Sequence, residues 1–349
     1  MKTLNNNCKI LIVCGIALFF ACENKTPVSN PADDGFAKGA DISWLTEMEA
    51  AGRKFYNSNG EEMECMALLK SLGINSIRLR VWVNPVEHGN WCNKEDLIAK
   101  AKRADELGMR LMIDFHYSDW WADPGKQNKP AVWENFSIEE LKNAVSEHTV
   151  EILEALKQES LTPEWIQVGN ETDNGLLWET GKASVNMKNY AELMQAGYDA
   201  SKSVFPDTKV MIHVSNGYDK NLFRWNFDGL KANGVKWDVV GMSLYPSYAK
   251  DKGYDTWQKA NDACIANIKD AIERYDTEVM ICEVGMPYNQ AEDCKNFLTD
   301  LIKQSKLVPD NKVIGVFYWE PQCYNWEGYQ LGAFDNTGKP TVAMEAFSN

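Results

Sequence analysis

Short apolar, β-branched runs alternate with longer segments of helical periodicity from residue 36 to the end of the chain. Eight such runs are expected to be strands: 36–43, 76–83, 110–116, 164–169, 210–214, 237–244, 278–284 and 313–319. Helices are expected at 63–72, 94–107, 138–158, 187–205, 257–275 and 291–306. Eight strands that alternate with helices over about 310 residues predict α/β architecture, a single (β/α)8 TIM barrel.

A doubly wound parallel sheet is the alternative arrangement for alternating strands and helices. The dinucleotide-binding members of that class carry a Gly-rich GxGxxG turn after the first strand, and no such turn follows 36–43. The chain also shows no fixed-period repeat and no linker after residue 35. The barrel is therefore expected to be one domain, residues 36–349.

The N-terminus predicts an export signal. Lys2 and Lys9 precede an uncharged stretch, 10–21, which is too short to span a membrane comfortably. Residues 1–21 are expected to be a signal peptide, and Cys22 directly after Ala21 resembles a bacterial lipoprotein processing site. The position of Phe19 usually holds Leu in that motif, so simple secretion remains an alternative. Residues 22–35 are polar and Pro-containing and predict a lipidated Cys followed by a flexible tether to the outer membrane.

Charge and cysteine content limit the partners. The formal net charge of −14 argues against binding nucleic acid, an acidic membrane surface or a polyanionic substrate. Four histidines without metal-ligand spacing predict no zinc site, and no cofactor is expected. Six cysteines follow the tether, and one or two disulfides among them are plausible in an exported protein. A monomer is expected.

Polar and aromatic residues gather where the predicted strands end, which is where a (β/α)8 barrel places its chemistry. Two of these ends carry a glutamate after an apolar run, Glu171 after 164–169 and Glu283 within 278–284. Two carboxyls that face each other across a barrel mouth are what a retaining glycosidase requires, one protonated and one ionised. Asn170, beside Glu171, is expected to hold the sugar 2-hydroxyl. A salt bridge at a strand end is the competing interpretation of either glutamate alone.

Five stretches together resemble glycoside hydrolase family 53, the endo-β-1,4-galactanases: Gly39-Ala40-Asp41-Ile42-Ser43, Arg78-Leu79-Arg80-Val81-Trp82, the block 114–127 ("DFHYSDWWADPGKQ"), Val168-Gly169-Asn170-Glu171 and Cys282-Glu283-Val284-Gly285. The resemblance runs from about residue 36 to the C-terminus, and its most specific part is the block 114–127. It implies a (β/α)8 fold and hydrolysis of β-1,4-galactan within the chain with retention of configuration. It further implies that Glu171 is the acid/base and Glu283 the nucleophile.

The same resemblance suggests residues that orient the nucleophile and the sugar: Arg80, His116, Asn170, His213, Tyr245 and Trp319. Asp41, Asp119, Trp120 and Trp121 complete the candidate substrate contacts, the tryptophans because galactan offers an apolar sugar face to an indole. Arg80 could instead make a structural ion pair, and Asp119 could be a turn residue. Some family members hold calcium after the seventh strand, but 286–293 lacks a clear oxygen-ligand cluster, so no metal is expected. His213 is followed by Val214-Ser215 where the family has Leu-Asp, which leaves a sugar contact from that loop open.

Three functions are compatible with these residues. The first is an exported endo-β-1,4-galactanase that acts on galactan in pectin and type I arabinogalactan. The second is a retaining glycosidase on another β-linked polymer, such as mannan or glucan, since only groove residues would separate them. The third is a non-catalytic surface lipoprotein that binds glycan, although a binding module needs neither Glu171 nor Glu283.

Overall fold

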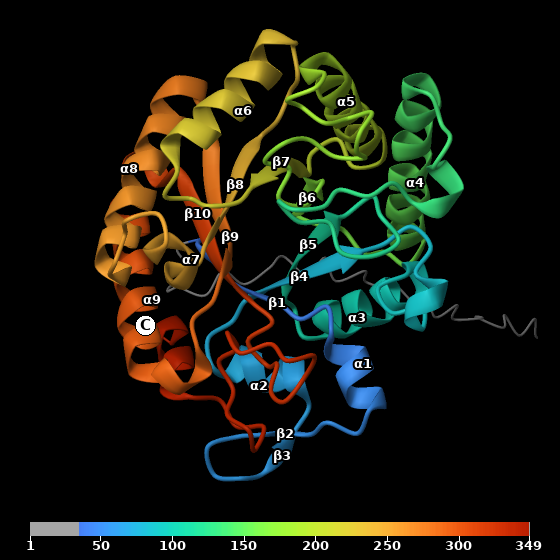
Figure 1. The fold of residues 1–349 in the computed structure, drawn as a ribbon. Helices are drawn as coiled ribbons and strands as arrows, with labels where there is room; N and C mark the ends of the chain where they lie inside the picture. Colours follow the sequence, from blue (N-terminus) through green and yellow to red (C-terminus); the bar gives the residue numbers. More distant parts are fainter. Residues whose placement is uncertain (1–34, 349) are drawn as a thin grey trace, which may run out of the picture. The chain divides into compact units, whose positions relative to one another are not determined.

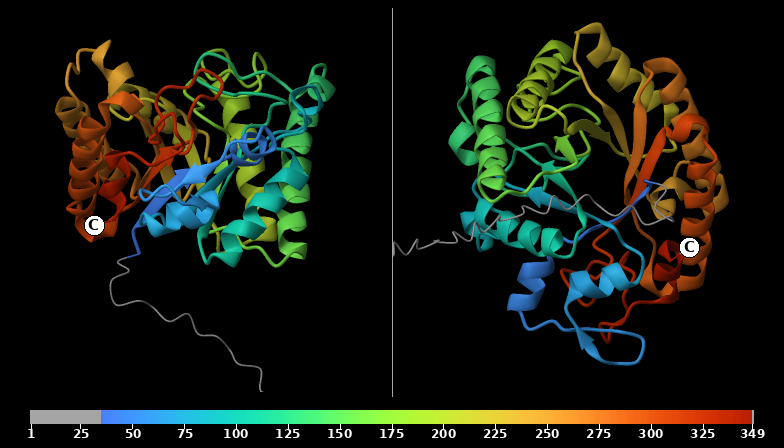
Figure 2. Two further views of the ribbon diagram at one scale, coloured as in Figure 1. Left: turned by 90° about the horizontal axis from the view of Figure 1, so that it is seen from below. Right: turned by 180° about the vertical axis from the view of Figure 1, so that it is seen from behind.

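Eight parallel strands close into a barrel in the computed structural model, which describes residues 35–348. Hydrogen-bonded neighbours follow the order β1-β10-β9-β8-β7-β6-β5-β4, so each strand lies beside the next barrel strand in sequence and the last closes on the first. Helices surround the barrel on the outside (Figures 1 and 2). The predicted (β/α)8 fold is confirmed.

The barrel strands are β1 Ala37–Asp41, β4 Ser76–Val81, β5 Arg110–Phe115, β6 Trp165–Val168, β7 Lys209–Val214, β8 Val239–Leu244, β9 Glu278–Val284 and β10 Val313–Trp319. A two-stranded hairpin, β2 Phe55–Tyr56 with β3 Glu62–Met63, lies outside the barrel. All eight predicted strands are present, and the last two have the predicted bounds. Strand β7 begins one residue earlier than predicted, and the other five are shorter because residues at their ends turn into loops.

The helices are α1 Leu45–Ala50, α2 Cys65–Ser71, α3 Lys94–Glu106, α4 Ile138–Gln158, α5 Met187–Val204, α6 Lys220–Ala232, α7 Pro246–Lys250, α8 Trp257–Tyr275 and α9 Ala291–Lys306. All six expected helices form. Helix α6, between β7 and β8, was not among them, although its buried Phe223, Phe227 and Leu230 recur at helical spacing. Short 3-10 turns lie at Val86–His88, Ala131–Trp133, Tyr288–Gln290, Pro309–Asn311 and Val342–Phe347.

The barrel interior changes from apolar to polar along the strands. Met112, Trp165, Met211 and Phe317 belong to a buried apolar cluster. Two residues further along, on the same face of each strand, Asp114, Gln167, His213 and Trp319 follow. The amino end of the barrel is therefore a packed hydrophobic layer, and the carboxyl end presents buried polar groups beneath the mouth.

The six cysteines from Cys65 to Cys323 are free and buried, so the expected disulfides are wrong for this part of the chain. Two of the thiols contact other side chains: Sγ of Cys264 lies 3.6 Å from the sulfur of Met242, and Sγ of Cys294 lies 3.6 Å from the Tyr318 hydroxyl. They are small core residues on different elements. In the described part, no helix is long and apolar enough to cross a membrane. The predicted signal, Cys22 and almost all of the tether lie outside the described residues.

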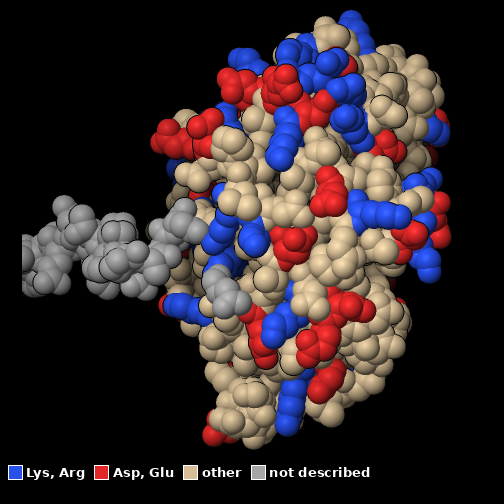
Figure 3. All heavy atoms as spheres, turned by 90° about the vertical axis from the view of Figure 1, so that its left-hand side faces the viewer, with Lys and Arg blue, Asp and Glu red and all other residues tan. Residues whose placement is uncertain are grey.

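Acidic and basic side chains intermix on the face of the barrel domain near α8 and α9 (Figure 3). On α6 and α8, Arg224 pairs with Asp270 and Arg274 pairs with Asp228. Because the charges of opposite sign alternate, this face offers no extended basic surface to a polyanion.

Candidate active site

Glu171 lies just beyond the end of β6, where the backbone turns sharply. Gly169 has φ +77°, and a Cβ there would lie 2.6 Å from the Thr172 side chain, so glycine is needed. Glu171 itself has φ +43°, which is uncommon for a residue with a side chain. The amide of Thr172 donates to the carbonyl of His213 at 2.9 Å and ties the turn to β7. The turn directs the Glu171 side chain into the barrel mouth, where it borders a cavity.

The Glu171 carboxyl is held as an acid. Burial raises its pKa well above the ordinary value, and the nearby Glu283 and Asp173 carboxyls raise it further. One polar contact opposes this, because Ser243 Oγ donates to Oε1 of Glu171 at 2.7 Å. Arg78 also lowers the pKa of Glu171, but its effect is smaller than those of burial, the two carboxyls and Ser243. The environment therefore favours a protonated Glu171.

Glu283, on β9, borders the same cavity and is held as a base. Burial raises its pKa, but Arg78 lowers it through an ion pair of 2.9 Å between Nη1 and Oε1. The Tyr245 hydroxyl donates to Oε2 at 3.0 Å. Both carboxylate oxygens have a donor, so the charge sits on Glu283 and the proton on Glu171.

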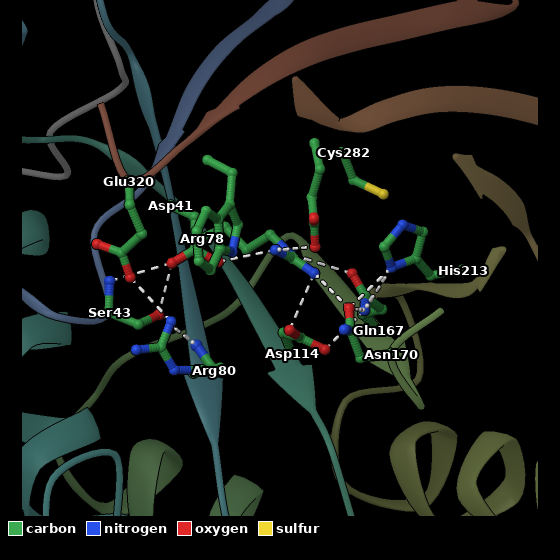
Figure 4. A network of polar contacts seen from close by, with 12 residues as sticks. Asp41, Ser43, Arg78, Arg80, Asp114, Gln167, Asn170, His213, Cys282 and Glu320 are labelled. Atoms are coloured by element: carbon green, nitrogen blue, oxygen red, sulfur yellow. Dashed lines mark hydrogen bonds and ion pairs between the residues drawn. The ribbon is translucent and has the colours of Figure 1, made fainter. Parts of the chain in front are cut away.

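Arg78 is the centre of a buried polar network beneath the mouth (Figure 4). Its guanidinium pairs with Asp41 at 2.8 Å and with Asp114 at 2.9 Å, besides Glu283. Nε donates to Gln167 and Nη2 to the Asn170 oxygen. The side chain is fully enclosed, and these contacts fix the one cation that faces the nucleophile candidate.

Arg80 does not make the expected contact with the nucleophile. Its Nη1 pairs with Glu320 at 2.8 Å, so the structural ion pair considered above is the correct interpretation. The prediction failed because Arg78 and Arg80 lie on the same face of β4. Arg78 lies deeper in the barrel, and it is the one that reaches Glu283. The Arg80 guanidinium lies 4.2 Å from the Trp121 ring and just over 5 Å from Trp82 and Trp44.

Aromatic side chains form one wall of the mouth. A cavity of about 290 Å³ contains both glutamates and is bordered by Trp121, Trp319 and Tyr245. A second cavity of about 760 Å³ shares Trp121 and Trp319 and adds Trp44, Trp91 and Trp120. Because the two cavities share their aromatic lining, they form one groove that extends past the glutamates toward the loops after β1, β4 and β5.

The remaining predicted contacts divide between the cavity and the layer below it. His116 and Asn170 border the smaller cavity; His116 Nε2 lies 3.1 Å from Asp114, and Asn170 Nδ2 donates to the Ala122 carbonyl at 2.9 Å. His213 and Asp41 are fully buried beneath it. Asp119 accepts from the backbone amides of Asn84 and Ala131, which is the turn role considered for it. Trp120 stacks on His88 with centroids 3.5 Å apart.

Five site residues were not identified from the sequence: Arg78, Asp114, Gln167, Ser243 and Glu320. A signal existed for three of them. Arg78, Asp114 and Ser243 lie two residues before the predicted site residues Arg80, His116 and Tyr245, and residues two apart share a face of a strand. Polar residues one step deeper than the mouth are therefore expected to support it.

Among residues 35–348, no three His, Cys, Asp or Glu side chains cluster as metal ligands. The chemistry that the site offers is that of its carboxyls. A protonated Glu171 and an ionised Glu283 at one cavity can supply a proton and a nucleophile to a glycosidic bond.

The chain is similar to known glycoside hydrolases. Residues 37–347 match Glycosyl hydrolase family 53. An arabinogalactan endo-beta-1,4-galactanase of Thermothelomyces thermophilus is 31% identical over 86% of this chain and 93% of its own length. A fungal beta-1,4-galactanase structure superposes with TM-score 0.81 at 28% identity, covering 90% of this chain and 99% of its own. A GH53 catalytic domain from Ignisphaera aggregans gives 0.80 and 28%, covering 92% and 97%.

Proposed function

The chain belongs to glycosyl hydrolase family 53, and we propose that it cleaves internal β-1,4-galactosidic bonds of galactan and type I arabinogalactan with retention of configuration. The observation that supports this most directly is the pair Glu171 and Glu283, which border one cavity. Burial raises the pKa of both, to about 7 for Glu283 and further for Glu171, so Glu171 is the one that holds a proton. The match to named galactanases supports the choice of polymer.

In the first step of the proposed reaction, Glu283 attacks the anomeric carbon of the sugar above it. Arg78 and Tyr245 hold its two oxygens, so one oxygen needs only to exchange its hydrogen bond for the new C–O bond. Glu171 gives its proton to the departing glycosidic oxygen. The products are a shortened chain and a covalent galactosyl ester on Glu283.

In the second step, water hydrolyses the ester. Glu171, now ionised, takes a proton from the water as it attacks the anomeric carbon, and Glu283 leaves as a carboxylate. Both residues then have their initial protonation states. Two displacements on opposite faces of the same carbon retain the β configuration.

The groove supports cleavage within a chain rather than at its end. The larger cavity continues from Trp121 and Trp319 away from Glu171, and its tryptophans offer flat apolar faces to further sugars. Because the larger cavity does not include Glu171 or Glu283, it can hold further sugars of the chain beyond the one at the cleavage point. Both carboxyls come from one chain, which supports a monomer as the active form.

The product profile over time on linear β-1,4-galactan tests this function, with β-mannan and β-glucan as alternative substrates. We expect mixed long galacto-oligosaccharides early and none from Glu283→Ala. Single galactose or galactobiose from the start would contradict internal cleavage. No cleavage of galactan by folded protein would contradict the choice of polymer, and no cleavage of any of the three would favour a binding protein.

We propose further that the protein is exported and anchored to the outer membrane by a lipid on Cys22, facing either the periplasm or the cell surface. The residues before and after Cys22 support this, as described from the sequence. The barrel begins at Ala37, the amino end of β1, opposite the carboxyl ends that bear the site. Cys22→Ala should move the enzyme from the membrane fraction to the soluble fraction, and an unchanged distribution would contradict lipidation.

A further inference from the structure

A serine on β8 connects Glu171 to a buried histidine on β7. Ser243 Oγ donates to Oε1 of Glu171 at 2.7 Å, and Nε2 of His213 lies 2.9 Å from the same Oγ. Ser243 is 1% exposed and His213 0%. Any residue could make the backbone contacts of these two strand positions. The choice of a serine and a histidine therefore requires a reason that lies in their side chains.

The surroundings of His213 indicate which nitrogen carries its proton. Burial lowers the pKa of the ring well below its usual value, and Arg78 lowers it further, so the imidazole is neutral. The backbone N–H of Glu171 donates to Nδ1 at 3.4 Å. The Gln167 amide nitrogen, which gives one of its two hydrogens to Asp114, lies 3.1 Å from Nδ1.

One oxygen, Asn170 Oδ1, is also 2.9 Å from Nδ1, but Arg78 already donates to it (Figure 4). The ring therefore accepts at Nδ1 and carries its proton on Nε2. That proton is directed at Ser243 Oγ, and the serine's own proton is left for Glu171.

We propose that His213 and Ser243 are positioning residues for the acid/base. His213 orients the Ser243 hydroxyl as a donor, and the hydroxyl holds Oε1 of Glu171 in place whether Glu171 is protonated or ionised. The inference rests on the proposed function, because it takes Glu171 as the group that protonates the leaving oxygen. The hydrogen bond persists through the reaction and strengthens when Glu171 is ionised, since bonds to a charged acceptor are stronger. It stabilises the carboxylate that forms as the leaving group departs.

Several groups besides Ser243 act on Glu171. Glu283 from β9 and Asp173 from the same loop favour the protonated form, while Arg78 from β4 favours the ionised form. Tyr245, directly after β8, and Tyr248, on α7, also face the two glutamates. A substitution at Ser243 leaves all of these in place, so its effect reports the one hydrogen bond.

The test compares Ser243→Ala, Ser243→Thr and wild type by kcat/KM against pH on two substrates, galactan and a dinitrophenyl β-galactobioside. The dinitrophenolate leaves without protonation, so its release does not need the acid. Ser201→Ala is the matched control, because Ser201 is also a fully buried serine but lies on α5 and donates to the Gly197 carbonyl.

For Ser243→Ala we expect kcat/KM on galactan to fall about tenfold to a hundredfold, the loss of one hydrogen bond to a charged group. Hydrolysis of the dinitrophenyl substrate should remain near wild type. The alkaline limb of the galactan profile should move to higher pH, because the lost bond lowered the pKa of Glu171. Ser243→Thr should restore the limb, and Ser201→Ala should match wild type.

Equal losses on both substrates, or an unmoved alkaline limb, would overturn the positioning role. Nitrogen NMR of the wild type provides a measurement that needs no variant, and with four histidines in the chain the spectrum is simple. We expect the His213 proton on Nε2, and a proton on Nδ1 would overturn the inference. In each of these cases wild type would still cleave galactan, whereas failure of the proposed function would appear as an inactive wild type.

Discussion

Arg78 and Arg80 lie two residues apart on β4 and are both buried, yet their surroundings differ. Arg78 pairs with three carboxylates, from Asp41, Asp114 and Glu283. Arg80 pairs with one, from Glu320, and otherwise faces indole rings. Among the described residues, Nε and Nη2 of Arg80 have no hydrogen-bond acceptor.

The difference shows two uses of a buried cation. Ion pairs have direction and fix individual oxygen atoms, so Arg78 can hold a reacting carboxylate in place. Ring faces attract a guanidinium without fixing single atoms, and they offset part of the cost of its unpaired N–H groups. Arg80 therefore supports a surface, the aromatic wall around Trp121. Under the proposed function, Arg78 acts on the nucleophile, and the ion pair of Arg80 with Glu320 supports the aromatic wall.

Arg78→Lys should have the largest effect. A lysine cannot pair with three carboxylates at once, and unpaired buried charges cost about 3–5 kcal/mol of unfolding free energy. We expect the melting temperature to fall and kcat on galactan to fall at least about a hundredfold. The matched control is Arg110→Lys, at the amino end of β5, whose partner Glu164 is half exposed. That change should cost no more than about 1 kcal/mol. Equal effects of the two substitutions would contradict the assignment of Arg78.

Arg80→Lys should separate KM from kcat. The lost contact with Trp121 and its neighbours is worth about 1–2 kcal/mol, so KM for galactan should rise about 5-fold to 30-fold. The value of kcat should change little, because Glu283 keeps its own cation. Initial-rate kinetics on galactan of defined length measure both constants. A fall in kcat at constant KM would mean that Arg80 acts on the nucleophile after all.

Trp120→Ala should have the smallest effect of the three. Trp120 borders only the larger cavity and is already stacked on His88. We expect KM for galactan to rise about threefold, the value of one aromatic contact. The reference variant is Trp121→Ala, which removes a ring that borders both cavities and should raise KM more. The reverse order would place the bound chain on the outer side of the groove.

The fold was predictable because each barrel strand is a short apolar run with a turn residue after it. Strands β9 and β10 have the expected bounds, since Gly285 and Pro321 interrupt the pattern at their ends. The two glutamates stood out for the same reason, because Glu171 follows such a run and Glu283 lies next to the end of one. Helix α6 was not predicted, because aromatic and charged residues are mixed along it and obscure its helical periodicity.

The supporting residues were harder to predict. Arg78 and Arg80 share a strand face, and the sequence does not reveal which one is deep enough to reach β9. Ser243 carries the single hydroxyl of an otherwise apolar strand, so the sequence indicates a core residue. Its contact with Glu171 is visible only in the structure. The disulfide prediction failed because a count of six cysteines says nothing of which elements bring them together. The roles of the two arginines, of Ser243 and of the cysteines all depend on contacts between elements that are distant in the sequence.

Proton NMR during the first minutes of galactan hydrolysis tests the central claim most directly. Reducing ends released by Glu171 and Glu283 acting together should appear first as the β-anomer, followed by slow mutarotation to the equilibrium mixture. Glu283→Ala should release none. Initial release of the α-anomer would mean a single displacement by water, and would contradict the assignment of Glu283 as the nucleophile.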